Sequence, residues 1–150
     1  MLSLAHTATG AIIASKIPNP YISIPLVLAS HYLEDYIVHW DCGTGLSKGI
    51  KKKSEALVQE FFELGLSLLF IYLFFQKGST QLNYPVWIGA FVALIPDFLE
   101  APRNFLKWEP SFLKPFNNFH GKFHNSTPNM ILGLTPQLVL LFVIALVAKY

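Results

Sequence analysis

The chain has 150 residues, of which 53% are hydrophobic and 13% are charged. A soluble domain usually carries about 25% charged residues, so this composition argues against a water-soluble protein and for a membrane protein. The net charge of +2 is too small to indicate a nucleic-acid partner. A single cysteine excludes an intrachain disulfide.

Five apolar stretches follow one another and predict an all-α membrane protein with one domain, residues 1–150. The first, residues 2–16, would be about 22 Å long as a helix at about 1.5 Å per residue, which is short for a bilayer. The others cover residues 22–40, 54–75, 84–98 and 130–148. We therefore expect an integral membrane helical bundle of four to five segments.

The basic residues are concentrated in two connections between these stretches. Residues 41–54 contain four lysines and residues 101–129 contain Arg103 and three lysines, whereas the turn at 77–83 has Lys77 alone. Cytoplasmic connections of membrane proteins carry an excess of Lys and Arg. Both basic connections are thus expected on the cytoplasmic side of a prokaryotic inner or plasma membrane, next to membrane lipid. In this topology the histidine and carboxylate clusters all reach that same face.

The densest of these clusters lies at the end of the second apolar stretch. His31, Asp35 and His39 follow at intervals of four residues, so a continuous helix would place them on one stripe. Glu34 would lie about 100° to one side, with Asp41 on the side of Glu34. Histidine and carboxylate are metal ligands, and a carboxylate can also orient a ligand histidine. The alternative is a buried hydrogen-bonded network without metal.

Three further clusters carry the same residue types. His120 and His124 are four apart, which is a common zinc-binding pair on a helix. Asp97 ends an apolar stretch, where a carboxylate is usually functional, while Glu100 is typical of a solvated helix end. His6 is either a ligand or an interfacial histidine. We expect His31, Asp35, His120 and His124 to converge around one centre.

Other polar residues are candidates for catalysis or substrate binding. Glu63 lies deep in the third apolar stretch and needs a partner there, so Glu63 and Glu34 are candidate general bases. Lys122 and Arg103 are candidates to hold an anionic substrate group. His39 and Asp41 are candidate additional ligands or partners of the ligands.

In these motifs the chain resembles the small bacterial and archaeal membrane-bound metal-dependent hydrolases related to zinc-dependent phospholipase C. The resemblance covers most of the chain. It rests on the segments His6 to Gly10, Ser30 to Asp41, Ile95 to Asp97, and His120 to Ser126. It implies a helical membrane fold and a zinc-type site. The implied ligands are His6, His31, Asp35, Asp97, His120 and His124.

One departure from that family pattern concerns the last motif. Such families often show His-Arg-Gly before Thr-His-Ser, whereas here Gly121 and Lys122 follow His120 and precede Phe123 and His124. The arginine is missing, and Lys122 is the candidate to replace it.

These observations favour a membrane hydrolase of a lipid-like phosphoester, acting at the cytoplasmic interface. The cofactor is expected to be zinc or another divalent metal, with one ion or two, because six or seven ligands exceed the four of one tetrahedral zinc. One alternative is a non-enzymatic helical membrane protein that binds structural metal, haem or a pigment, or that serves as a subunit of an oligomer or larger assembly. Another is a metal or proton transporter.

Overall fold

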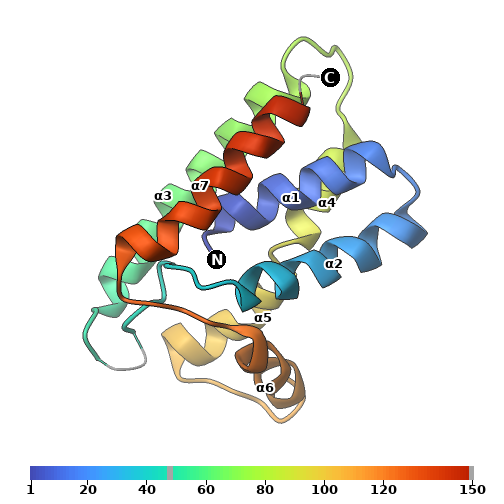
Figure 1. Ribbon diagram of the computed structural model, residues 1–150. Helices are drawn as coiled ribbons and strands as arrows, with labels where there is room; N and C mark the ends of the chain where they lie inside the picture. The colour runs from blue at the N-terminus through green and yellow to red at the C-terminus, as the bar shows by residue number, and fades with distance from the viewer. Residues whose placement is uncertain (47–48, 149–150) are drawn as a thin grey trace.

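The computed structural model describes residues 1–46 and 49–148, and these residues form helices but no β-strand (Figure 1). Two of the helical segments are short π-helical turns that continue a preceding α-helix. In chain order the elements are α1 (Ser3–Lys16), α2 (Pro20–Tyr36), α3 (Lys53–Ile71), η1 (Tyr72–Gln76), α4 (Tyr84–Val92), α5 (Ile95–Ala101), η2 (Pro102–Leu106), α6 (Lys114–Phe123) and α7 (Met130–Val147).

Helix α1 is the centre of the fold and packs against α2, α3, α4 and α7 (Figure 1). Small side chains make this packing close, since Ala5, Ala8, Ala11 and Ala14 are all buried. The tightest approach is between α1 and α4 at a pair of glycines. A Cβ on Gly10 would overlap the carbonyl oxygen of Gly89 and lie 2.9 Å from its carbonyl carbon. Any larger residue would push the two backbones apart.

The number of membrane-length helices is smaller than the sequence predicts. Within residues 1–46 and 49–148, two helices are long and apolar enough to cross a bilayer, Lys53–Gln76 and Met130–Val147. The pair Tyr84–Val92 with Ile95–Leu106 adds a third if it forms one span. The expectation of four to five membrane segments is therefore wrong. Helix α1 has 14 residues and α2 has 17, which correspond to about 21 and 26 Å.

The fourth apolar stretch is broken where α4 meets α5, with a bend of 41°. Pro96 follows the break and has no N–H to donate to the preceding turn, which explains why the helix does not continue straight. The carbonyl group of Ala93 lies at this break and accepts a hydrogen bond from His31 Nδ1 at 2.8 Å. The break thus joins α4 to the histidine cluster of α2.

Helix α2 ends at Tyr36, four residues earlier than the apolar pattern suggests. Ile37 is already extended, with φ −70° and ψ 140°, so the prediction that His39 and Asp41 lie on the helix is wrong. Instead, His39 pairs in parallel with Ser126. His39 N–H donates to the Asn125 carbonyl at 3.2 Å and Thr127 N–H donates to the His39 carbonyl at 2.8 Å. The chain after α2 is held against the chain after α6.

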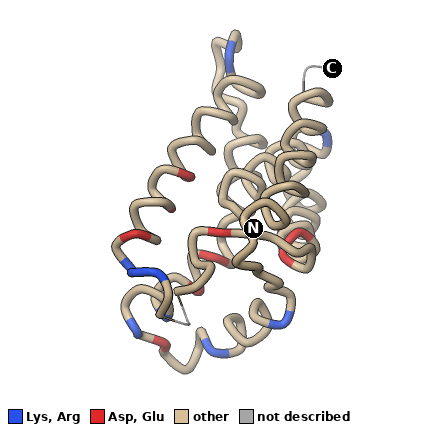
Figure 2. Tube along the Cα trace, turned by 60° about the vertical axis from the view of Figure 1, so that its left-hand side comes forward, with Lys and Arg blue, Asp and Glu red and all other residues tan. Residues whose placement is uncertain are grey.

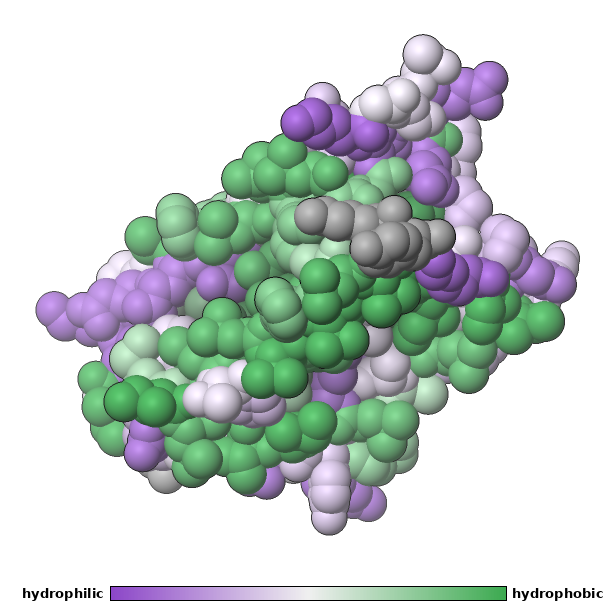
Figure 3. Space-filling model, turned by 45° about the horizontal axis from the view of Figure 1, so that its top comes forward, coloured by the Kyte–Doolittle hydropathy of each residue, from purple (hydrophilic) through white to green (hydrophobic). Residues whose placement is uncertain are grey.

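The two basic connections lie at the same end of the molecule. Lys53 Nζ donates to the carbonyl oxygen of Phe105 at 2.7 Å, which ties the start of α3 to η2. Figure 2 shows most Lys and Arg positions at this end, while the top tip and the upper right-hand side also carry blue segments. Large apolar side chains cover much of the face in Figure 3. On α3 and α7 the exposed residues include Phe61, Phe62, Leu68, Leu138, Val139 and Phe142.

Candidate metal centre

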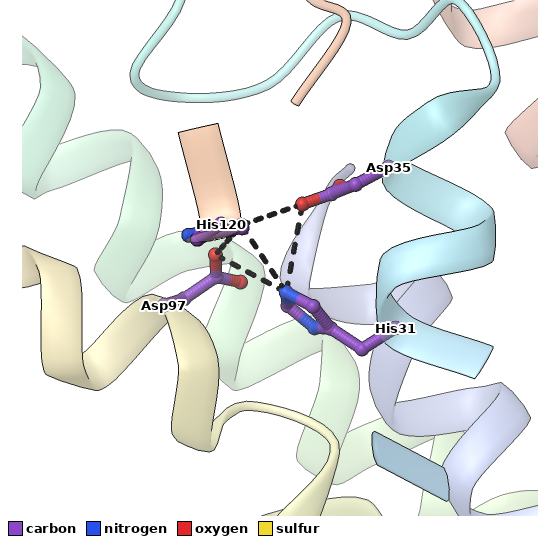
Figure 4. Close-up of side chains that lie close together, drawn as sticks. All are labelled: His31, Asp35, Asp97 and His120. Atoms are coloured by element: carbon purple, nitrogen blue, oxygen red, sulfur yellow. Dashed lines mark hydrogen bonds and ion pairs between the residues drawn. The ribbon is translucent and has the colours of Figure 1, made fainter. Parts of the chain in front are cut away.

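Four ligand-type side chains from three helices meet beside the break between α4 and α5. They are His31 and Asp35 from α2, Asp97 from α5 and His120 from α6 (Figure 4). One nitrogen or oxygen atom from each lies within 4.8 Å of the others. We call these four residues the first group.

The two histidines of the first group point their Nε2 atoms at each other, 3.3 Å apart. His31 Nδ1 faces the Ala93 carbonyl, which can only accept, so Nδ1 carries the proton and Nε2 of the neutral ring has a lone pair. His120 Nδ1 lies 3.1 Å from Glu100 Oε2, while its Nε2 lies 2.7 Å from Asp35 Oδ2. A carboxylate or carbonyl behind the ring is the arrangement found at metal-ligating histidines.

The carboxylates around His120 favour a cation at this position. Burial lowers the pKa of His120, but Asp35 and Glu100 outweigh this effect and raise the pKa to about 10. Without a metal, a proton therefore joins His120 to Asp35 at neutral pH. A metal ion at the same place would displace that proton.

A second group of ligand-type atoms adjoins the first and shares Asp35. It consists of Asp35, His39 and His124, again with one atom from each within 4.8 Å of the others. Asp41 lies at its edge, because Oδ2 of Asp41 is 3.2 Å from Nε2 of both His39 and His124. Burial raises the pKa of Asp41, but the rings of His124 and His39 outweigh burial and hold it below its ordinary value. Burial lowers the pKa of His124, but Asp41 raises it above the ordinary value.

His6 and Glu34 form a pair on the other side of Asp35. His6 Nδ1 lies 2.7 Å from Glu34 Oε2, and His6 Nε2 lies 3.2 Å from Asp35 Oδ1. The His6 ring stacks on His31 with 4.0 Å between the ring centroids. The amino group of Met1 contacts Asp35 Oδ1 and lies 3.0 Å from His6 Nε2. His6 is thus adjacent to the metal-ligand groups but belongs to neither.

The remaining candidates are spread more widely. Glu63 lies on α3 and makes no hydrogen bond or ion pair with either group among the residues described in the structure. Lys122 is exposed on α6. Arg103 pairs with Glu100 and lies 3.5 Å from Glu109, so one carboxylate separates it from His120. The prediction that Glu100 is simply solvated is wrong, because it contacts both His120 and Arg103.

Two positions that hold the site are not among the residues predicted from the sequence. The first is the Ala93 carbonyl behind His31, which no side-chain pattern reveals. The second is Gln137 on α7, whose buried amide accepts from Leu2 N–H at 2.7 Å and donates to the Trp40 carbonyl at 2.8 Å. The sequence could have identified Gln137, because it is an isolated amide in a highly apolar stretch and needs a hydrogen-bond partner there.

Of the four residues expected to converge on one centre, His31, Asp35 and His120 lie in the first group, whereas His124 lies in the second group, which shares Asp35. Each group could hold a metal ion. The donor set fits the ligand preferences of zinc, which takes imidazole nitrogen and carboxylate oxygen. Asp97 gives the first group an open edge: its side chain is 31% exposed, whereas His31 and Asp35 are fully buried. No family model, curated protein or solved structure matches this chain, so the site itself is the basis for assigning a function.

Proposed function

We propose that this protein is a membrane-bound hydrolase that uses a divalent metal ion, most consistent with zinc, to cleave a phosphoester of a lipid-like substrate. The observation that carries the proposal is the first group, in which His31, Asp35, Asp97 and His120 direct ligand atoms toward one point. Imidazole nitrogen and carboxylate oxygen are ligand types of zinc, and an ion that takes three of these four groups keeps its fourth position for water.

The burial of these groups supports a bound cation. Carboxylates and ring nitrogens with converging lone pairs repel one another, and the penalty is large where water is excluded. Without metal, the proton on His120 Nε2 faces Asp35 Oδ2 at 2.7 Å and the lone pair of His31 Nε2 at 3.3 Å. A metal ion between these three atoms would replace that proton and take all three as ligands.

An ion in this site would supply Lewis-acid chemistry and lower the pKa of a water molecule toward about 7. The exposed edge at Asp97 is where we expect the substrate to enter. We assign the substrate's phosphate to Arg103, whose side chain is 34% exposed and pairs with Glu100 next to His120. Guanidinium suits phosphate because it donates two parallel hydrogen bonds. Lys122 is the second candidate for this role.

We assign proton transfer to Glu34 acting through His6. Glu34 Oε2 holds His6 Nδ1 at 2.7 Å, which leaves Nε2 facing the Asp35 carboxylate at the centre. Burial and the Met1 ammonium lower the pKa of His6, but Asp35 and Glu34 outweigh them and raise it to about 9, so the ring holds a proton that it can donate at neutral pH. Glu63 stays an alternative base, but it has no contact that links it to the ligands among the described residues.

A lipid-like substrate agrees with the apolar surroundings of the site. Helices α3 and α7 are long and apolar enough to cross a membrane. An open groove of about 620 Å³ begins next to His39 and could receive an acyl chain. It is lined by Ile37, Val38, Asn129, Ile131, Leu132, Thr135 and Pro136. The basic end of the molecule, which also carries the site, would face the cytoplasm.

The test is purification in detergent without chelator, followed by metal analysis and phosphoesterase assays on short-chain lipid phosphates. Asp35→Asn and Asp97→Asn should lose activity and the zinc ion of the first group, because each change removes a negative ligand while keeping the side-chain shape. Glu55→Gln, at an exposed carboxylate in the first turn of α3, is the matched control and should retain both. Wild-type protein without bound metal, or equal zinc content in Asp35→Asn, would contradict the proposal.

A further inference from the structure

We infer that a second divalent cation binds beside the first, in a site formed by His39, Asp41 and His124 that shares Asp35 with the first group. This inference rests on the proposed function and makes the centre binuclear. It concerns residues that come mainly from extended segments rather than from helices, since α2 ends at Tyr36 and α6 at Phe123.

The ligand atoms of this second site converge as closely as those of the first. Asp41 Oδ2 lies 3.2 Å from Nε2 of His39 and 3.2 Å from Nε2 of His124. The two Nε2 atoms are 3.4 Å apart. His39 Nδ1 donates to the Ile37 carbonyl at 2.8 Å, so Nε2 of the neutral ring offers its lone pair to the site. The opposed nitrogens repeat the arrangement of His31 and His120.

Asp41 supplies an independent sign that a ligand belongs here. The residue is only 6% exposed; Oδ2 lies 3.2 Å from the rings of His39 and His124 without hydrogen-bond geometry, and Oδ1 has no partner among the described residues. A buried carboxylate without hydrogen bonds is costly and uncommon in folded proteins. A cation between Asp41, His39 and His124 would give that carboxylate its partner.

The backbone holds these side chains in place. The parallel pairing of His39 with Ser126 fixes the segment after α2 beside the segment that carries His124. Helix α7 closes the other side, because Gln137 donates to the Trp40 carbonyl at 2.8 Å. Gly133 leaves no room for a side chain, since a Cβ there would lie 2.7 Å from the His39 carbonyl carbon. A site held in this way is preorganised for a ligand.

Asp35 is placed to bridge the two sites. Its Oδ2 lies 2.7 Å from His120 Nε2 and 3.5 Å from His31 Nε2, while Oδ1 lies 3.7 Å from His39 Nε2. Each carboxylate oxygen thus faces the histidines of a different site, as in centres with two ions about 4 Å apart. The Met1 amino group also contacts Oδ1, so a second ion would compete with this ammonium for that oxygen.

The experiment measures zinc bound per chain, after gel filtration in detergent, for the wild type and four variants. We expect two ions in the wild type and in the control Glu55→Gln. We expect one ion in Asp41→Asn, which keeps the side-chain shape, and one in His124→Asn. The second of these variants changes a side chain that is 29% exposed and thus tolerates substitution better. Asp97→Asn should also retain one ion, in the second site. Circular dichroism and melting in detergent check that each variant is folded.

The outcomes separate this inference from the proposed function. One ion in the wild type that persists in Asp41→Asn and His124→Asn but is lost in Asp97→Asn overturns the second site and leaves the proposed function standing. One wild-type ion that disappears in Asp41→Asn overturns the division into two sites. No ion in the wild type overturns both. Two ions that fall to one in Asp41→Asn support the binuclear centre.

Discussion

The close contact between α1 and α4 makes Gly10→Ala a sensitive test of the fold that holds the site. A Cβ on Gly10 would overlap the Gly89 carbonyl oxygen and lie 2.8 Å from the Ala93 Cβ. Both neighbours belong to the α4 segment, and the backbone oxygen cannot rotate away. Overpacking of this kind costs about 1–3 kcal/mol, occasionally more. The gain in helix propensity from Gly to Ala offsets about 1 kcal/mol of this cost.

The matched control is Gly65→Ala on α3, where a Cβ would meet no atom within 4 Å. The same exchange there should stabilise the helix by about 1 kcal/mol. The net cost of Gly10→Ala is about 0–2 kcal/mol, so at about 2–4 °C per kcal/mol for a chain of this size it should melt up to about 8 °C below the wild type. Gly65→Ala should melt about 2–4 °C above the wild type. Differential scanning fluorimetry in detergent measures both.

The same substitution should reach the metal site through Ala93. Displacing α4 moves the carbonyl that orients His31, so zinc affinity should fall in Gly10→Ala and stay unchanged in Gly65→Ala. If Gly10→Ala melts as high as Gly65→Ala, the backbone contact between α1 and α4 does not exist as described. The arrangement of α1 at the centre of the fold would then be refuted.

Three further predictions follow from the site and the topology. Zinc affinity should rise with pH between about 7 and 9, by up to tenfold per pH unit for each proton displaced. The reason is that the pKa of His120 is raised to about 10, and the ring must lose its proton to bind metal. Competition against a zinc chelator measures the affinity, and an affinity that does not change with pH would contradict the prediction. Gln137→Leu should leave the Leu2 N–H and the Trp40 carbonyl unpaired, which costs about 1–3 kcal/mol of stability for each group. It should also weaken zinc binding, measured in the same titration, with Gln81→Leu at an exposed position as the control. Cysteines placed at Lys52 and Lys114 should label from the same membrane face, and labelling from opposite faces would refute the topology.

Local patterns in the sequence were sufficient to predict several structural features of this protein. The low charge content indicated apolar surfaces, and α3 and α7 are indeed long and apolar enough to span a membrane. The four-residue spacing of His31 and Asp35 predicted that both lie on one face of a helix, and their Nε2 and Oδ2 atoms are 3.5 Å apart. These features depend on helical periodicity and composition, which are properties of short stretches of chain.

Packing between distant segments determined where α2 ends and which residues meet at the site. The apolar pattern predicted that the second helix continues to Trp40, but α2 ends before Ile37. Two residues later, His39 pairs with Ser126. Glu100 resembled a solvated helix end until α6 brought His120 to it. Asp35 is central because His120, 85 positions away, folds against it. Such contacts depend on which helices meet and at what angle. The packing of residues distant in sequence sets this geometry, as in the close backbone contact between Gly10 and Gly89, and no local pattern reveals it.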